Sequence, residues 1–179
     1  MKIGLAGTVS VGKTTFVNYL KETTDLGFEF IVERSKYLMG MGIPLNTDST
    51  LKGQSIFLAE RVSELFKDSM VTDRSVIDVM AFTNLAKTIK PSEKDDFEKH
   101  ASNLLNEYDI IFYVSPKGIE IENNGIRETD SDYRNKIDNE INRLLIKYRH
   151  KIKNLATLEG SNIERYETFI NVYNGCINR

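Results

Sequence analysis

Residues 4–20 read GLAGTVSVGKTTFVNYL, and eight of them, from Gly7 to Thr14, follow the pattern G-x-x-x-x-G-K-T. The apolar run Lys2–Ala6 before this pattern predicts a buried strand, and residues 14–23 after it predict an amphipathic helix. A glycine-rich turn in that setting lets several backbone N–H groups point at one phosphate, and the helix adds its positive N-terminal end. The stretch therefore predicts a phosphate-binding loop.

Two side chains of this loop have a predicted role with the nucleotide. Lys13 can reach the β- and γ-phosphates, and the Thr14 hydroxyl can ligate Mg²⁺. The loop positions expected to contact the nucleotide are Gly7, Val11, Gly12, Lys13, Thr14 and Thr15. For Thr15, as for Ser10, the alternative is that the hydroxyl only satisfies the backbone of the loop.

Strand and helix patterns alternate about five times along the chain. The expected strands are Lys2–Ala6, Phe28–Val32, Met70–Thr72, Asp109–Val114 and Ala156–Leu158. Helical spacing of apolar residues is expected near residues 14–23, 51–67, 76–82, 133–148 and 163–173, with a further helix to about 106. This alternation predicts an α/β fold with a parallel sheet covered by helices on both faces. Ligands of such sheets bind beyond the carboxyl ends of the strands.

Composition narrows the class of protein. The 179 residues suit one domain, 1–179, and 40% hydrophobic with 28% charged residues is ordinary for a soluble protein. The net charge of −2 and the lack of a long basic run argue against duplex nucleic acid as a partner. A single cysteine, Cys176, and no apolar run near the roughly 20 residues of a membrane span favour a cytoplasmic location without a membrane partner.

A phosphate loop alone does not separate a switch, a motor and a transferase. A GTPase switch would have an N-K-x-D sequence in a loop that reads guanine, and the one match in this chain, residues 135–138, falls within the helix expected near residues 133–148. A motor usually needs further modules for partner contact, and this chain is small. The remaining class is a kinase of small molecules, in which catalysis is mostly positioning and charge neutralisation around the transferred phosphoryl group.

Several segments beyond the loop resemble nucleoside and nucleotide kinases. DRSVIDVMAF, residues 73–82, resembles the D-R-x-x-x-S-x-x-A-Y segment of thymidylate kinases, with Asp78 in place of the usual Ser and Phe82 in place of Tyr. Its first three residues also resemble the E-R-S motif of deoxynucleoside kinases. GIRETDSDYR, residues 125–134, resembles the arginine-bearing lid of both groups and of nicotinamide riboside kinases. LEGSNIER, residues 158–165, is similar to the turn that flanks the adenine of ATP in P-loop kinases.

This resemblance implies a three-layer α/β/α P-loop kinase fold with a five-stranded parallel sheet and a lid at about residues 116–135. It implies ATP and Mg²⁺ as cofactors, with Gly160 beside the adenine. Arginines of a closing lid can stabilise the charge that spreads over the transferred group. We expect Arg127 in this catalytic role and Arg134 at the bound nucleotide.

Five polar residues that follow the second and third predicted strands, or begin the next helix, are expected to act on the acceptor. Asp73 could contact Mg²⁺ through water, hold the acceptor or act as a base, or it could cap the following helix. Glu33 favours a hydroxyl acceptor, because a hydroxyl benefits from a base that takes its proton. Arg34 and Arg74 favour a monophosphate, which needs positive charge and no base. Gln54 could read a nucleobase through its amide, or lie on the surface.

The leading hypothesis is a (deoxy)nucleoside monophosphate kinase that acts on a pyrimidine. The pattern of residues 73–82 and the arginines Arg34 and Arg74 favour it. The alternative is a nucleoside or nicotinamide riboside kinase that phosphorylates a 5′-hydroxyl, as Glu33 favours. A hypothesis from another class is a non-catalytic nucleotide-binding regulatory protein. The partner is in each case a small molecule, and association of two chains as a homodimer is left open.

Overall fold

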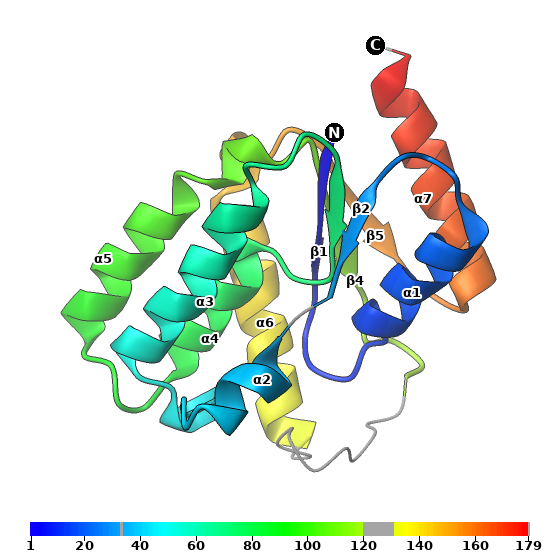
Figure 1. Cartoon of the computed structure of the whole chain (residues 1–179). Helices are drawn as coiled ribbons and strands as arrows, with labels where there is room; N and C mark the ends of the chain where they lie inside the picture. The colour runs from blue at the N-terminus through cyan, green and yellow to red at the C-terminus, as the bar shows by residue number, and fades with distance from the viewer. Residues whose placement is uncertain (33, 120–130, 179) are drawn as a thin grey trace.

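The computed structural model describes residues 1–32, 34–119 and 131–178 of the chain. Its sheet has five parallel strands in the order β2-β3-β1-β4-β5. The strands are β1 (Lys2–Ala6), β2 (Glu29–Ile31), β3 (Met70–Thr72), β4 (Ile110–Val114) and β5 (Leu155–Leu158). All five predicted strands are therefore present, and β1, which leads into the phosphate loop, lies at the centre of the sheet (Figure 1).

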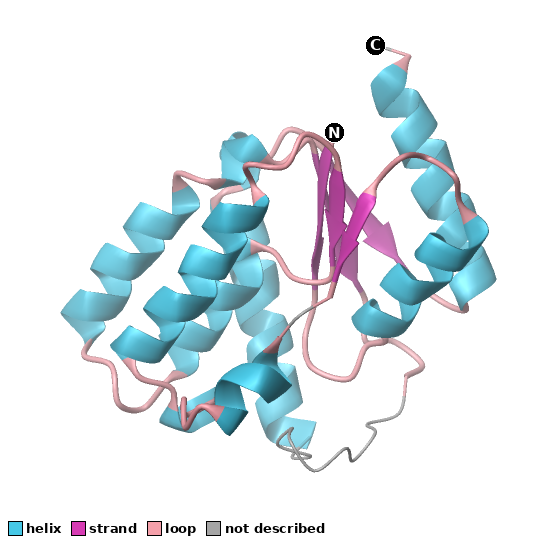
Figure 2. Ribbon diagram, viewed as in Figure 1, coloured by secondary structure: helices cyan, strands magenta, loops and turns pink. Residues whose placement is uncertain are grey.

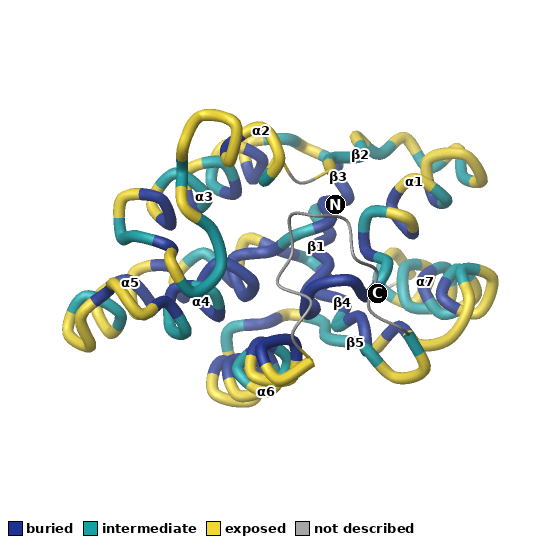
Figure 3. Tube along the Cα trace, turned by 90° about the horizontal axis from the view of Figure 1, so that it is seen from below, coloured by how far each residue is buried: buried dark blue, intermediate teal, exposed yellow. Residues whose placement is uncertain are grey.

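Helices cover both faces of the sheet (Figure 2). The α-helices are α1 (Lys13–Thr23), α2 (Ser35–Gly40), α3 (Leu51–Glu64), α4 (Val76–Leu85), α5 (Pro91–Ser102), α6 (Ser131–Lys147) and α7 (Asn162–Ile177). Short 3₁₀ helices are η1 (Asn46–Asp48), η2 (Leu105–Glu107) and η3 (Arg149–Lys151). Seen along the strands, α1 and α7 lie on one side of the sheet and α3, α4, α5 and α6 on the other (Figure 3).

Each face of the sheet has its own apolar core. Phe16 and Leu20 of α1 pack with Phe169 of α7 against Leu5 and Phe112 of the sheet. The opposite core is larger and centres on α4, whose residues Val76–Ala81 are nearly all inaccessible to solvent. The three-layer α/β/α architecture with a five-stranded parallel sheet is thus confirmed.

Local chemistry explains where the helices begin. The Thr50 side chain accepts from the Gly53 N–H at 3.1 Å and caps α3. Ser75 caps α4 together with Asp78, and Ser161 caps α7 together with Glu164. Such caps satisfy N–H groups that have no partner within the helix. The caps at Ser75 and Ser161 fix the starts of the helices that follow β3 and β5. These helix starts lie at the carboxyl ends of the strands, where ligands of parallel sheets bind.

No helix in the described parts of the chain is long and apolar enough to cross a membrane. The apolar residues at helical spacing near 133–148 form the buried face of α6, since Tyr133, Ile137, Ile141 and Leu144 are buried against the larger core.

Candidate active site at the carboxyl edge of the sheet

The phosphate loop needs both of its glycines. Gly12, the N-cap of α1, has a left-handed backbone with φ of 77°, which glycine adopts without a steric penalty. A Cβ atom at Gly7 would lie 2.8 Å from the Val114 carbonyl oxygen, so β4 leaves no room for a side chain there. The loop joins β1 to α1 at the lower end of the sheet in Figure 1.

Lys13 lies along the inner side of this loop. Its Nζ donates to the carbonyl oxygens of Gly7 at 2.6 Å and Thr8 at 2.8 Å, and the side chain is buried. Nζ also lies 3.9 Å from Asp78 Oδ1. A buried ammonium group in this position can neutralise charge on a phosphate held by the loop.

The two predicted metal ligands lie together. The Thr14 hydroxyl of α1 donates to Asp73 Oδ2 at 2.5 Å, and Asp73, at the end of β3, is buried. Mg²⁺ prefers oxygen ligands and is usually held by one or two protein groups with phosphates and waters. Within residues 1–32, 34–119 and 131–178, no group of three or more His, Cys, Asp or Glu side chains could bind a metal by itself. Thr14 and Asp73 therefore fit a Mg²⁺ ion that arrives with a nucleotide.

Asp78 connects the phosphate loop to a neighbouring pocket, a role that the sequence pattern did not indicate. Its side chain has no solvent exposure. Oδ1 accepts from the Gly7 N–H at 3.2 Å and from Arg74 Nη1 at 3.4 Å, besides facing Lys13. Oδ2 accepts from the N–H and hydroxyl of Ser75 at 3.0 and 3.1 Å. The only sequence signal for this role is that Asp78 replaces the usual Ser in the segment that resembles thymidylate kinases.

The pocket beside the loop is lined by aromatic, aliphatic and polar side chains. Its described lining residues are Val9, Ser35, Leu45, Asn46, Ser49, Gln54, Phe57, Arg74, Asp78, Val79 and Phe82. Gln54 is only 3% exposed, so it lies in the pocket wall rather than on the surface. The Arg74 guanidinium stacks over the Phe82 ring, 5.0 Å from its centroid.

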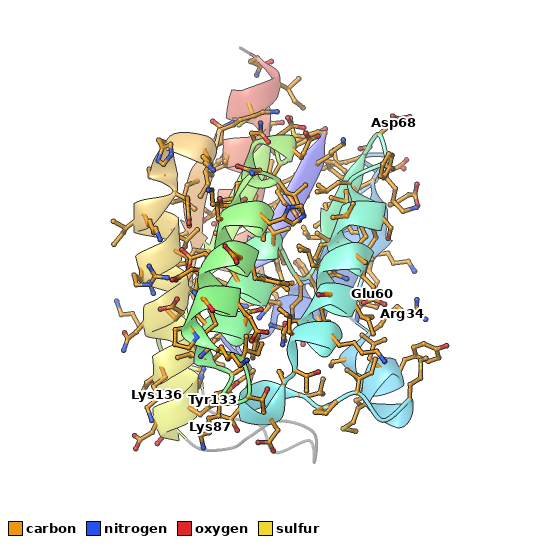
Figure 4. The ribbon with its side chains drawn as sticks, turned by 90° about the vertical axis from the view of Figure 1, so that its left-hand side faces the viewer. Arg34, Glu60, Asp68, Lys87, Tyr133 and Lys136 are labelled. Carbon is orange, nitrogen blue, oxygen red and sulfur yellow. The ribbon has the colours of Figure 1, made fainter. Side chains whose placement is uncertain are left out.

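Arg34 lies outside this pocket. It precedes α2, is exposed, and stacks over the Tyr37 ring at 4.5 Å from the centroid. Its Nη1 lies 3.7 Å from Glu60 Oε1 on α3, and the two side chains lie close together in Figure 4. The predicted acceptor residues Gln54 and Arg74 thus line one pocket, whereas Arg34 is not among its described lining residues.

Two buried arginines border the phosphate loop. Arg134, in the first turn of α6, donates from Nη1 to the Ile119 carbonyl at 2.8 Å, and its own carbonyl accepts from the Thr8 hydroxyl at 2.8 Å. Arg165 of α7 donates from Nη1 to the Val11 carbonyl at 3.0 Å. Nε and Nη2 of both arginines have no hydrogen-bond partner in the part of the chain that the structure describes. Burial lowers the pKa of both guanidinium groups, and an anion beside them would stabilise their charged form.

Arg165 belongs to the segment that resembles an adenine-flanking turn, but no local pattern singles it out. In the same turn, Gly160 has a left-handed backbone with φ of 76° and precedes α7. Thr15 is exposed on α1 and Val11 is buried in the loop. Glu33, Arg127 and most of the lid expected at 116–135 lie outside the described residues, so their roles stay predictions.

Fold and site together define a P-loop nucleotide-binding protein with the α/β/α architecture of P-loop kinases. A protein-family model described as "AAA domain" matches residues 2–165, and the chain belongs to this family. No curated protein matches the sequence.

Solved structures share this fold at low sequence identity. Deoxyadenosine kinase from M. mycoides with bound dCTP is 18% identical with a TM-score of 0.65, covering 98% of this chain and 100% of that chain. The same enzyme with products dCMP and dCDP is 14% identical with a TM-score of 0.61, over the same shares. NadR protein in complex with NAD and AMP-PNP is 13% identical with a TM-score of 0.71, covering 99% of this chain but 49% of that chain.

Proposed function

We propose that this protein is an ATP-dependent kinase that transfers the γ-phosphoryl group to the 5′-hydroxyl of a nucleoside. The observation that supports phosphoryl transfer is that the phosphate loop and the pocket adjoin each other. Val9 of the phosphate loop lines the pocket, and Asp78 of the pocket accepts from the Gly7 N–H of the loop. A group bound in the pocket would lie next to phosphates bound in the loop, as in-line transfer requires.

The pocket wall favours a nucleobase-containing acceptor. Phe57 and Phe82 offer aromatic surfaces, and the buried Gln54 has one amide donor and one acceptor group for a base edge. The structural relatives that share the fold are deoxyadenosine kinase and a NadR protein, for which a complex with NR is also solved. Their ligands agree with the acceptor class that the pocket favours.

The charge of the pocket favours an unphosphorylated acceptor over the monophosphate that the sequence pattern favours. Of the lining residues that the structure describes, two are charged, Arg74 and Asp78, and their charges are opposite. A monophosphate acceptor needs a net positive site. Arg34, the second cation expected for it, is exposed beside Glu60. A nucleoside monophosphate kinase remains the second candidate, because Arg74 could turn toward an acceptor phosphate.

Each residue of the donor site has a role in this proposal. The loop backbone and Lys13 bind the β- and γ-phosphates of ATP, and Arg134 and Arg165 offer further donors beside the loop. Thr14 and Asp73 hold Mg²⁺, which supplies charge neutralisation on the phosphates when bound. Glu33 is proposed as the base that takes the hydroxyl proton, and Arg127 as the lid cation of the transition state.

An ADP-release screen tests the proposal. The protein is incubated with ATP and Mg²⁺ against a panel of nucleosides, including nicotinamide riboside, and against the matching 5′-monophosphates. We expect turnover with a nucleoside. Turnover only with a monophosphate would select the second candidate, and ADP release that needs no acceptor would support a nucleotide-binding regulatory protein instead.

A further inference from the structure

Asp78 introduces a negative charge where a kinase of phosphorylated acceptors would need a positive one. Its carboxylate is completely buried, yet it faces two cations, Lys13 of the phosphate loop at 3.9 Å and Arg74 of the pocket at 3.4 Å. A buried carboxylate in this position is costly unless such partners compensate it.

The position of Asp78 is fixed by local structure. Ser75 donates to Oδ2 through its N–H and its hydroxyl, which closes the capping box of α4. Since Oδ2 is held by the helix start, Oδ1 is directed at the Gly7 N–H and at Arg74. The charge therefore cannot move away when a ligand enters the pocket.

An acceptor phosphate placed near Arg74 would meet this fixed charge. Two like charges separated by several ångströms in a site partly screened from water repel each other by enough to change affinity tenfold or more. An uncharged 5′-hydroxyl meets no such repulsion. The same carboxylate lowers the positive potential that Arg74 can offer to a phosphate.

We propose that Asp78 determines the acceptor preference of this protein: its buried carboxylate offsets the charge of Arg74 in the pocket and so favours an unphosphorylated nucleoside over a nucleoside 5′-monophosphate. This inference rests on the proposed function. Asp78 acts here as a specificity-determining residue through charge, and it undergoes no proton transfer.

The test compares wild type with Asp78→Asn, which keeps the volume of the side chain and removes its charge. Two quantities are measured with 2′-deoxyadenosine, thymidine and their 5′-monophosphates. One is the ratio of kcat/KM for monophosphate to that for nucleoside, and the other is the Kd of each compound by calorimetry without ATP. We expect Asp78→Asn to shift both preferences about tenfold toward the monophosphate.

Asp138→Asn is the matched control. Asp138, on α6, also acts on Lys13 through its charge but lies outside the pocket, where it accepts from the Tyr113 hydroxyl at 2.9 Å. Its substitution should leave the acceptor ratio unchanged. An equal shift in both variants would overturn the proposal, because the effect would then come from the charge around Lys13 rather than from the pocket.

A variant that keeps Asp78 leaves the proposal testable should Asp78→Asn fold poorly. Arg74→Gln should shift the preference in the opposite direction, away from the monophosphate. The double variant Asp78→Asn/Arg74→Gln restores the charge balance and should return the ratio to within about threefold of wild type. A double variant with the ratio of Asp78→Asn alone would contradict the charge argument.

The two measurements separate this inference from the proposed function. Transfer to nucleosides by wild type without any shift in Asp78→Asn would overturn the inference and leave the function in place. A shift in Kd toward monophosphates without transfer by any variant would overturn the function and support the inference. Wild-type protein that binds neither class of compound would overturn both.

Discussion

Lys13 donates to two carbonyl oxygens of its own loop and faces Asp78, so its ammonium group is held at the boundary between loop and pocket. Thr14 and Asp73 form a second contact, from α1 to the residue after β3. At the scale of single residues, the site is thus a set of short polar contacts between the loop after β1 and the residues after β3.

Replacing Lys13 tests the donor site. Lys13→Ala should lower kcat/KM for phosphoryl transfer by about 100-fold or more, because the transferred group loses a preorganised positive charge. The measurement is steady-state ADP release with the preferred acceptor. Lys21→Ala, an exposed lysine on the same helix, is the control and should behave as wild type. Retained acceptor-dependent activity in Lys13→Ala would contradict the assignment.

Replacing Asp73 tests the metal assignment. Asp73→Asn should raise the Mg²⁺ concentration needed for half-maximal activity about tenfold, because the carboxylate near the Thr14 hydroxyl would lose its charge. Activity is titrated with Mg²⁺ at fixed ATP. Asp68→Asn changes an exposed aspartate in the segment before β3, labelled in Figure 4, and should leave the titration unchanged. An unaltered Mg²⁺ requirement in Asp73→Asn would argue for a role on the acceptor or in capping instead.

At the scale of elements, the start and type of most helices and strands follow from the sequence, because apolar periodicity and capping residues are local signals. β1 and β3 have the predicted bounds, and the bounds of α1 and α6 differ from the predicted ones by one or two residues. Helix α2, Ser35–Gly40, was not predicted, since six residues are too few for a periodic pattern and its only buried residue is Leu38.

The charged helix α5 shows a second limit of local patterns. The run of charged residues at 93–99 favours a solvated helix face, but Glu98 is buried and joins α5 to its neighbours. Oε2 accepts from Asn84 at 2.6 Å and from Arg143 at 2.9 Å, and Oε1 accepts from Lys147 at 2.7 Å. Its partners lie far away in sequence, so no local pattern reveals them.

Glu98 should make the stability of the fold depend on pH. Burial alone would raise the pKa of this carboxyl, but hydrogen bonds from Lys147, Asn84 and Tyr148 outweigh burial and lower the pKa to about 2. Because the pKa is lower in the folded state, the ionised Glu98 carboxylate stabilises the fold at pH values above the ordinary pKa near 4.5. This stabilisation is lost as the pH falls toward 2.

The corresponding variant is Glu98→Gln. At pH 7 its free energy of unfolding should fall by about 1–3 kcal/mol, and its difference from wild type should shrink between pH 4.5 and pH 2. Urea unfolding at several pH values gives both quantities. Asp95→Asn, an exposed change on the same helix, should show neither effect. A difference that is constant with pH would contradict the stabilising charge of Glu98.

At the scale of the whole molecule, the parallel sheet places both candidate sites at one edge. The strand order brings the loop after β1 next to the residues after β3, and helix α4 then brings Asp78 back to that loop. The sequence predicted the fold class and the phosphate loop, because both depend on neighbours in the chain. It did not predict the roles of Asp78 and Arg165, because each acts on a loop that lies 71 or 154 residues away.

The central claim is that this protein moves a phosphoryl group between two adjoining sites. The most direct measurement follows the γ-phosphoryl group of ATP by ³¹P NMR in the presence of Mg²⁺ and the nucleoside panel. We predict that the γ signal of ATP is replaced by that of a nucleoside 5′-monophosphate, together with ADP. Appearance of the phosphorus only as inorganic phosphate, or no loss of the ATP signal with any acceptor, would contradict the account.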